Sequence, residues 1–343
     1  WGDIAEFQGI SAFQGDETVR IEPLQFKTAG RGDIGGYWAA IRDPGADALI
    51  IIGNPNYRST WIMALAGRAM GKKILFWAHG WLRPEPPLKR LLRNTYYGLA
   101  DKVLVYGERA IEMAERSGFR RDKVAVIYNS LDWDQTKLHA DAAAAQDRNA
   151  LRAGFGMPLD KPVLICTARL TLLCQFDLLL NAAAQLRQAG QAYHIALVGD
   201  GPERVPLEQL ASDLCLDIRF HGAVYDEAKL ARMFAASDLT VSPGKVGLTA
   251  IHSLSYGVPV ITHGDLDAQM PEVEAIEPGI TGDFFERNNV DSLAAAIEDW
   301  FVVGRDPASV RAACHKVIEA KFNPLTQTRL IDKAVSDVLH DHS

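Results

Sequence analysis

The sequence has little cysteine and no long apolar run. Its 343 residues include four widely spaced cysteines, without a C-x-x-C pair. No histidine lies at zinc-ligand spacing, so we expect neither a disulfide framework nor a structural metal, as is usual in a reducing cytosol. The longest apolar stretches, such as 48–52 and 258–262, are the length of a strand, whereas a membrane-spanning helix needs about 18 residues. The sequence therefore predicts a cytoplasmic protein without a membrane span.

An excess of basic charge is also missing. The chain has 36 basic and 43 acidic residues, a net charge of −7, and we therefore expect no nucleic-acid partner. The first 155 residues carry +3 and the remainder −10, which indicates different tasks for the two halves. The length predicts two domains. The chain opens at Trp1 rather than at methionine, and whether its natural start precedes Trp1 is left open.

Short β-branched runs alternate with segments of helical periodicity. This alternation predicts an α/β protein in which helices cover parallel sheets. The predicted strands are 48–52, 73–78, 102–106, 124–128, 163–167, 194–198, 218–221, 239–242 and 258–262. The predicted helices are 59–70, 87–100, 108–117, 176–189, 203–214, 227–236, 247–256, 290–303 and 308–321. Residues 134–160 carry no strand signal and form the predicted boundary, so we expect domains over 1–140 and 141–322 and a C-terminal helix over 323–343 that returns to the first domain.

The segment 242–261 carries the clearest chemical signal. A predicted strand ends before Gly244, glycine recurs at Gly247, and a helix starts at once. Backbone amides at such a helix start bind anions, and Lys245 adds a positive charge beside them. Thr249 and His252 share one face of the helix. An ordinary strand–turn–helix, with a glycine for close packing, is an equally open interpretation.

Other loops follow neighbouring strands of the same half. They contain Arg169, Gly201 and Ala223, and the carboxyl ends of strands in a doubly wound sheet converge on one crevice. The guanidinium of Arg169 suits a phosphate because it offers two parallel donors, although a plain surface arginine stays open. The Gly199-Asp-Gly201 segment lacks the third glycine of a dinucleotide fingerprint, which disfavours that class of ligand.

A set of short motifs in the second half resembles a known family. The motifs are Arg169-Leu170, Asp177-Leu-Leu, Val198-Gly-Asp-Gly-Pro202, Phe220-His-Gly222, Ala236-Ser-Asp238, Gly247-Leu248, Tyr256-Gly-Val-Pro-Val-Ile261, Pro271-Glu272 and Gly279-x-x-Gly282. In this order they resemble the donor domain of the family 4 retaining glycosyltransferases, which have the GT-B fold. The loop around Asn129 and the Ala78-His79-Gly80 loop resemble two further segments of that family.

The resemblance implies a GT-B architecture of two Rossmann-like doubly wound domains facing a cleft. Residues 1–140 would bind the acceptor, residues 141–322 the donor, and 323–343 would form the crossover helix. The implied activity is retaining transfer of a hexose from a UDP or GDP sugar to a glycan or lipid-linked acceptor in polysaccharide biosynthesis. The resemblance implies no metal and no cofactor besides the nucleotide sugar.

The family's functional residues map onto positions of this chain. The implied catalytic residues are His79 and Arg169. The implied donor-binding residues are Arg169, Gly201, Ala223, Lys245, Gly247, Leu248, Thr249, His252 and Glu272. His79 and Asn129 would lie on the acceptor side, although a lone histidine after a strand is also often a packed loop residue.

The chain departs from the family pattern at three positions. Cys174 replaces a lysine, and Gly244 and His252 replace a pair of glutamates. A thiol does not supply the fixed positive charge of an ammonium group. Two alternatives therefore stay open: a degenerate member that binds a nucleotide sugar or glycan as a partner subunit, and a nucleotide-sugar epimerase.

Two further patterns have two interpretations each. Residues 81–99 are basic and leucine-rich, so they predict either peripheral contact with the inner face of a membrane or an amphipathic helix that covers the sheet. The D-x-D pairs at 132–134 and 265–267 spell a metal motif, but we expect no metal site there because that motif belongs to a different, single-domain glycosyltransferase fold.

Overall fold

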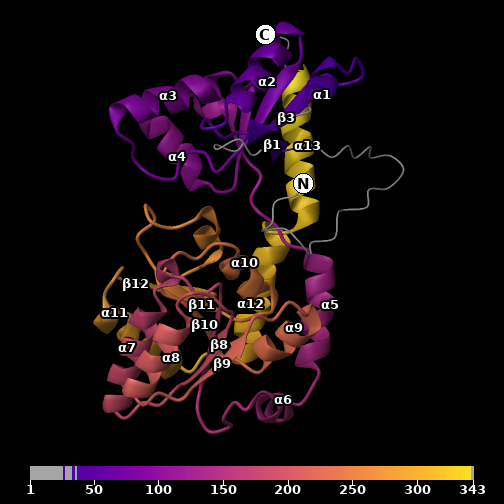
Figure 1. Cartoon of the computed structure of the whole chain (residues 1–343). Coiled ribbons are helices and arrows are strands. Elements are labelled where there is room, and N and C mark those ends of the chain that lie inside the picture. The colour runs from indigo at the N-terminus through magenta and orange to yellow at the C-terminus, as the bar shows by residue number, and fades with distance from the viewer. Residues whose placement is uncertain (1–25, 28–32, 35–36, 341–343) are drawn as a thin grey trace. The chain divides into compact units, whose positions relative to one another are not determined.

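The computed structural model describes residues 26–27, 33–34 and 37–340. The chain forms two compact units (Figure 1). One comprises the residues up to Ile127 together with those from Arg329 onward, and the other comprises Tyr128–Thr328. Within the described part of the chain, none of the helices combines the length and the apolarity needed to cross a bilayer.

The first unit is built on a parallel sheet in the order β3-β4-β5-β6. Its strands are β3 (Ala48–Ile52), β4 (Lys73–Trp77), β5 (Lys102–Val105) and β6 (Val124–Val126). Its helices are α1 (Trp38–Arg42), α2 (Arg58–Ala69), α3 (Pro87–Gly98) and α4 (Arg109–Arg116), with a short 3₁₀ turn η2 (Arg121–Lys123). The two-residue strands β1 (Phe26–Lys27) and β2 (Asp33–Ile34) pair antiparallel.

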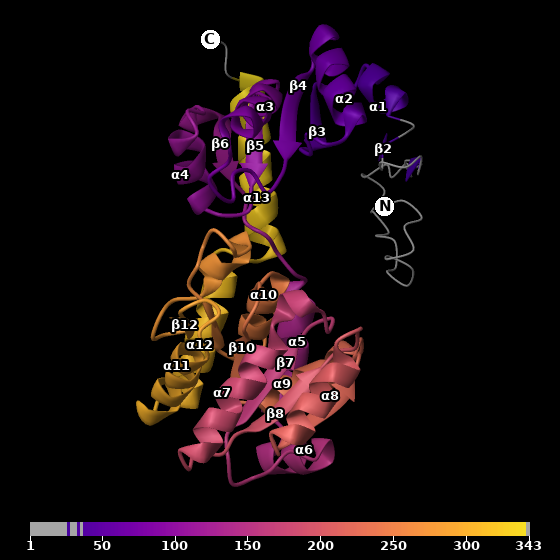
Figure 2. The ribbon, with the colours of Figure 1, turned by 60° about the vertical axis from the view of Figure 1, so that its left-hand side comes forward.

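Both faces of this sheet are covered by helices. Phe76 and Val103 pack on one face with residues of α2, α3 and α4. Leu75 and Leu104 point to the other face, where they pack against Ala334 of α13 (Pro324–His340). Figures 1 and 2 show α13 alongside the sheet. The predicted return of the C-terminal helix to the first domain is therefore confirmed.

The second unit is built on a six-stranded parallel sheet in the order β12-β11-β10-β7-β8-β9. Its strands are β7 (Val163–Thr167), β8 (His194–Val198), β9 (Ile218–Gly222), β10 (Leu239–Ser242), β11 (Val260–His263) and β12 (Gly282–Phe285). Its helices are α5 (Trp133–Ala144), α6 (Arg148–Phe155), α7 (Phe176–Gln188), α8 (Arg204–Asp213), α9 (Glu227–Ala235), α10 (Leu248–Ser255), α11 (Val290–Val302) and α12 (Pro307–Ala320). The 3₁₀ turns are η3 (Leu172–Cys174) and η4 (Pro271–Ala275).

Both faces of the central strand β7 are buried, which explains its apolar sequence. Leu164 and Cys166 point into a core formed with α7, α8 and α11, and Val163 and Ile165 point into a second core formed with α5, α6 and α9. A strand covered by helices on both faces has no polar side. The predicted fold of two parallel-sheet α/β domains is confirmed.

The structure differs from the sequence prediction between residues 133 and 155. The predicted boundary segment forms the helices α5 and α6. Helix α5 buries small side chains, Ala140 and Ala143, against α9, so its core-facing stripe lacks the large apolar residues that reveal a helix in sequence. The contacts divide the chain after Ile127, whereas the predicted division after residue 140 falls inside α5.

Candidate functional site

The second sheet changes winding direction between β7 and β10. From β7 the chain runs outward through β8 to β9, and from β10 it runs the other way through β11 to β12. In open parallel sheets, ligands bind beyond the carboxyl ends of the strands at such a switch point. A ligand site is therefore expected at the loops that follow β7 and β10. These loops contain Arg169 and residues 243–247.

The loops after β7 and β10 touch through their backbones. The amide of Gly244 donates to the carbonyl oxygen of Cys174 at 3.1 Å. A Cβ atom at Gly244 would lie 2.0 Å from the carbonyl oxygen of Leu173. Two of the departing positions, Cys174 and Gly244, are thus direct neighbours, and the glycine makes room for the turn that contains the cysteine.

The first turn of α10 leaves its backbone donors available. Gly247 precedes the helix, and no side chain caps that end. The Thr249 hydroxyl donates to the carbonyl oxygen of Thr167 at 3.4 Å, which ties this turn to the end of β7. Lys245 and Arg169 are exposed, and Leu248 is 43% exposed. The structure therefore brings the sequence-predicted phosphate residues to two adjacent loops.

A buried glutamine that the sequence analysis missed shapes the loop before α10. Gln269 is 3% exposed, and its Oε1 accepts from the Val246 amide at 2.8 Å. Its Nε2 donates to the Thr262 hydroxyl at 2.9 Å and to the carbonyl oxygen of His263 at 3.0 Å. The side chain replaces water as partner for these groups and fixes the loop. A single glutamine in a loop gives no sequence signal for this role.

Glycines bring the neighbouring loops equally close. A Cβ atom at Gly201 would lie 2.3 Å from the carbonyl oxygen of Leu170, and one at Gly199, whose φ is +148°, would lie 1.8 Å from that of Ala168. The Leu170 amide donates to the carbonyl oxygen of Asp200 at 3.0 Å. Gly201 is thus a packing residue for the Arg169 turn, while Ala223 is exposed one residue after β9.

The structure places Asn129 and Glu272 together in the second unit. The Asn129 side-chain amide donates to Oε1 of Glu272 at 2.7 Å. Glu272 is 3% exposed, and among the described residues its Oε2 has no hydrogen-bond partner. The sequence analysis had grouped Asn129 with the first domain. This assignment changes because its loop contacts η4.

His252 lies in a cluster that includes a carboxylate. Its Nε2 lies 3.5 Å from Oε2 of Glu227, the first residue of α9. The same oxygen accepts a short hydrogen bond from the Tyr256 hydroxyl. The hydrogen bonds from His252 and Tyr256 lower the pKa of Glu227 to about 2 despite its partial burial. Sequence reasoning missed Glu227 because acidic residues are common in the first turn of any helix.

His79 lies in the first unit, after the end of β4. Its ring is exposed and meets the edge of Tyr106 at 5.1 Å between centroids. The following Gly80 has a φ of +67°, and a Cβ there would lie 2.7 Å from a methyl group of Val105. The histidine therefore extends from a tight turn that only glycine fits well.

The first aspartates of the two D-x-D segments have structural partners. Asp132 caps α5 by accepting from the Gln135 amide at 3.2 Å. Asp265 pairs with Arg287 at 3.0 Å. These carboxylates serve a helix start and an ion pair.

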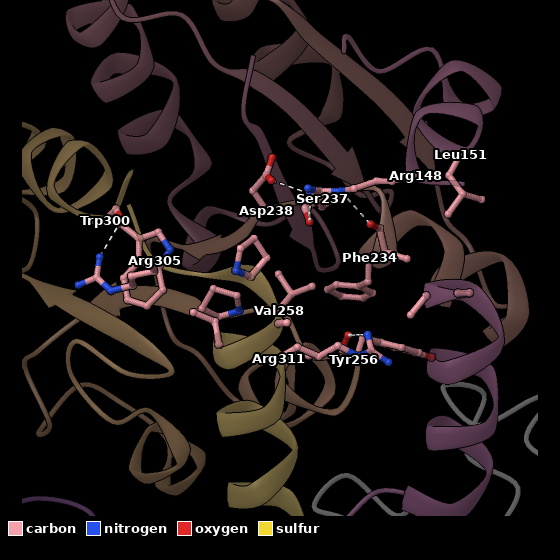
Figure 3. Close-up of a pocket in the computed structure, with 18 of the residues that line it drawn as sticks. Arg148, Leu151, Phe234, Ser237, Asp238, Tyr256, Val258, Trp300, Arg305 and Arg311 are labelled. Carbon is pink, nitrogen blue, oxygen red and sulfur yellow. Dashed lines mark hydrogen bonds and ion pairs between the residues drawn. The ribbon is translucent and has the colours of Figure 1, made fainter. Parts of the chain in front are cut away.

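A cavity of about 350 Å³ lies at the amino ends of strands of the second sheet (Figure 3). It is bordered by Asp238 and Val258, which precede β10 and β11, and by three arginines. Arg148 bonds to Asp238 at 2.6 Å, Arg305 stacks on Trp300 at 4.0 Å, and Arg311 donates to the carbonyl oxygen of Tyr256 at 3.1 Å. None of the sequence-predicted site residues lines this cavity.

Two family models match the chain, one in each half. Residues 147–313 match the model described as Glycosyl transferases group 1, and residues 30–135 match the model described as Glycosyltransferase Family 4. Together the two matched segments extend over most of both units.

Curated relatives from mycobacteria share one name. D-inositol 3-phosphate glycosyltransferase of Mycolicibacterium smegmatis is 26% identical over 243 residues, which are 67% of this chain and 51% of that protein. The protein of the same name from Mycobacterium tuberculosis is 27% identical over 228 residues, 63% of this chain and 44% of that protein. The chain spans about half the length of the curated relatives it matches.

Solved structures share the fold at low identity. Anabaena Alr3699/HepE in complex with UDP has a TM-score of 0.68 at 20% identity, covering 85% of this chain and 79% of that one. A glycosyltransferase from Rickettsia africae has a TM-score of 0.67 at 22% identity, covering 86% and 77%. With both halves matched by glycosyltransferase family models and most of the chain similar to such structures, this chain belongs to the family 4 glycosyltransferases of the GT-B fold.

Proposed function

We propose that the protein transfers a sugar from a UDP or GDP sugar to a glycan or lipid-linked acceptor, with retention of configuration and without a metal or other cofactor. The observation that carries the proposal is the meeting of the Arg169 turn and the uncapped start of α10 at the switch point of the second sheet. Solved relatives of this fold from Anabaena are complexes with UDP and with UDP-glucose, which supports a nucleotide-sugar donor.

The proposed reaction exchanges one C–O bond for another. The bond between the sugar C1 and the diphosphate oxygen breaks, the acceptor oxygen bonds to C1, and the acceptor hydroxyl gives its proton to the departing diphosphate. Negative charge grows on the departing diphosphate. We assign its stabilisation to Arg169, Lys245 and the amides at Gly247, because fixed donors aimed at developing charge need no reorganisation during the reaction.

The acceptor is assigned to the first unit. His79 is its proposed contact, since its exposed imidazole follows β4 and offers ring nitrogens that can hydrogen-bond to an acceptor hydroxyl. Leu248 and Thr249 are proposed to line the donor site, and Glu272 to contact the donor through its unpaired Oε2. Asn129 orients that carboxylate.

Nucleotide binding tests the proposal. We would measure the unfolding temperature and calorimetric affinity with UDP, GDP and a panel of their sugars, and follow nucleotide release with candidate acceptors. Arg169→Gln is expected to weaken binding about tenfold, because a charge-assisted hydrogen bond contributes about 1.5 kcal/mol or more. Arg187→Gln, on an exposed arginine in the last turn of α7, is the control. The proposal fails if no nucleotide stabilises the protein, or if both variants bind alike.

The surface of α3 supports a lipid-linked acceptor at a membrane. Leu88, Leu91 and Leu92 are 83%, 65% and 54% exposed, so they do not cover the sheet. The buried side of the helix consists of Tyr96 and Tyr97 instead. Exposed leucines beside Lys89 and Arg90 suit an anionic leaflet, where apolar side chains insert and cations meet lipid head groups. We propose that α3 is the membrane-contacting element.

A further inference from the structure

A carboxylate outside the predicted site residues is held in place near the start of α10. Glu227 follows β9 and begins α9, and its side chain is 53% exposed. Its Oε2 is engaged by Tyr256 and His252, whereas among the described residues its Oε1 has no hydrogen-bond partner. One oxygen therefore anchors the group, and the other is available to a ligand.

Ring contacts with Phe234 and with each other hold Tyr256 and His252, the two residues that anchor Glu227. Phe234 stacks on Tyr256 at 4.8 Å between centroids with an interplanar angle of 16°, and the His252 ring lies 4.9 Å from that of Tyr256. Tyr256 is 1% exposed, and its hydroxyl donates to Glu227. Asp226 caps the same turn of α9 by accepting from the Lys229 amide at 3.0 Å. The carboxylate is thus pre-oriented, which lowers the entropy lost when it binds a ligand.

The position of Glu227 matches the length of a nucleotide. His252 follows Gly247 by five residues, a distance of roughly 7.5 Å along the helix axis. A ribose is joined to its phosphate through a single methylene group, so a phosphate at the start of α10 places the ribose within about one helical turn. Carboxylates that follow a strand commonly bind ribose hydroxyls in doubly wound folds.

We propose that Glu227 binds the ribose hydroxyls of the donor nucleotide and that His252 and Tyr256 position it. The inference rests on the proposed function, because it assumes that the diphosphate lies at Gly247. It assigns ribose recognition to α9, whereas the sequence analysis expected donor contact from His252 itself. An ionised carboxylate accepts hydrogen bonds from two neighbouring hydroxyls, and a 2′-deoxyribose lacks one of them.

Calorimetric titration with UDP and with 2′-deoxy-UDP tests this assignment, repeated with GDP and 2′-deoxy-GDP. We expect the wild-type protein to bind the ribonucleotide about tenfold more tightly than its deoxy counterpart. Glu227→Gln is expected to weaken the ribonucleotide about tenfold and to abolish this discrimination. Tyr256→Phe, which keeps the carboxylate but frees its anchored oxygen, is expected to reduce the discrimination by less.

A matched control removes the same charge elsewhere. Asp213 is exposed at the end of α8, just before the amino end of β9, whereas Glu227 follows the carboxyl end of that strand. Asp213→Asn is expected to leave both affinities unchanged. Equal affinity of Glu227→Gln and wild type for UDP overturns the assignment, as does equal weakening of both nucleotides. If the wild-type protein binds neither UDP nor GDP, the proposed function itself fails, and the assignment fails with it.

Discussion

At the scale of single residues, Gly244 and Cys174 act as a pair. The glycine departs from the family pattern where the backbone of the cysteine turn lies against it. Restoring the family's residue at position 244 alone would therefore create a steric clash with the cysteine turn. A glutamate at 244 would push the Leu172–Cys174 turn aside, and the turn would need to move before the new side chain could reach a donor.

Gly244→Ala is expected to destabilise the protein by about 1–3 kcal/mol, because its Cβ would lie 2.0 Å from the Leu173 carbonyl oxygen. Urea unfolding measures the change. Gly154→Ala is the control, since a Cβ there meets nothing within 4 Å. Equal unfolding free energies for the two variants would contradict this account of the turn.

Asp238 joins three groups at the amino ends of the strands of the second sheet. Its carboxylate accepts from Arg148 and Arg152, each at 2.6 Å, and from the Val163 amide at 2.7 Å. Arg152 is 7% exposed. Removing the carboxylate leaves a buried cation without its partner, and breaking such pairs is costly.

Asp238→Asn is therefore expected to lower the free energy of unfolding by about 3 kcal/mol. The comparison is Asp122→Asn, which breaks the solvent-exposed pair with Arg120 and is expected to change the free energy of unfolding little. Chemical denaturation of both variants at pH 7 gives the two values. A loss for Asp238→Asn no larger than that for Asp122→Asn would show that the pair is not structurally important.

At the scale of elements, helix α3 connects the structure to the choice of acceptor. We expect wild-type protein to sediment with vesicles that contain phosphatidylglycerol and not with vesicles of phosphatidylcholine alone. The triple variant Leu88→Gln, Leu91→Gln and Leu92→Gln is expected to bind more than tenfold less, because each leucine loses its insertion into the apolar layer.

The control for α3 is Leu138→Gln, an equally apolar and exposed position on α5. Raising the salt concentration from 0.1 to 0.5 M is expected to weaken vesicle binding further, since the contribution of Lys89 and Arg90 is screened. Vesicle binding that is unchanged by the triple variant would exclude α3 as the contact.

The sequence predicts elements best where the core demands large apolar side chains. Strands β7 and β8 lie at the predicted residues because both faces of each strand are buried. Helix α5 was missed because alanine fills its contact with α9. Strand β12 was missed because Gly282 and Asp283 make up half of an edge strand that has only one neighbour.

Only part of the candidate site was predictable from the sequence. Arg169 and Gly247 follow from their places after strands, since topology brings the strand ends together. The partners Gln269 and Glu227 were not predictable, because their roles arise from contacts between segments far apart in the sequence. A carboxylate near a helix start carries no signal until the neighbouring helix is seen.

At the scale of the whole molecule, buried histidines make the protein sensitive to acid. Burial, with Arg311 and Lys137 nearby, lowers the pKa of His315 to about 4, and burial beside Arg219 lowers that of His221 to about 4. Their ordinary pKa is 6.5. Below pH 6.5 the unfolded chain therefore takes up protons that the folded protein does not, and stability falls until about pH 4.

We expect each of these histidines to cost about 1 kcal/mol of stability between pH 6.5 and 5.5. Carboxylates with lowered pKa values act only below about pH 4.5, so this window reports on the histidines. The double variant His221→Gln and His315→Gln is expected to flatten the dependence, while His340→Gln, at an exposed position of α13, keeps it. A flat profile for the wild-type protein between pH 6.5 and 5.5 would contradict these pKa values.

Helix α13 closes the core of the first unit, although it follows the second unit in the sequence. Leu75 and Leu104 belong to the first sheet, yet the side chain that closes their core is Ala334. Ribosomes make about 200 residues of the second unit between Ile127 and Arg329. The nascent first sheet therefore keeps one apolar face uncovered while the second unit is synthesised, and Ala334 can cover that face only after the whole second unit has been made.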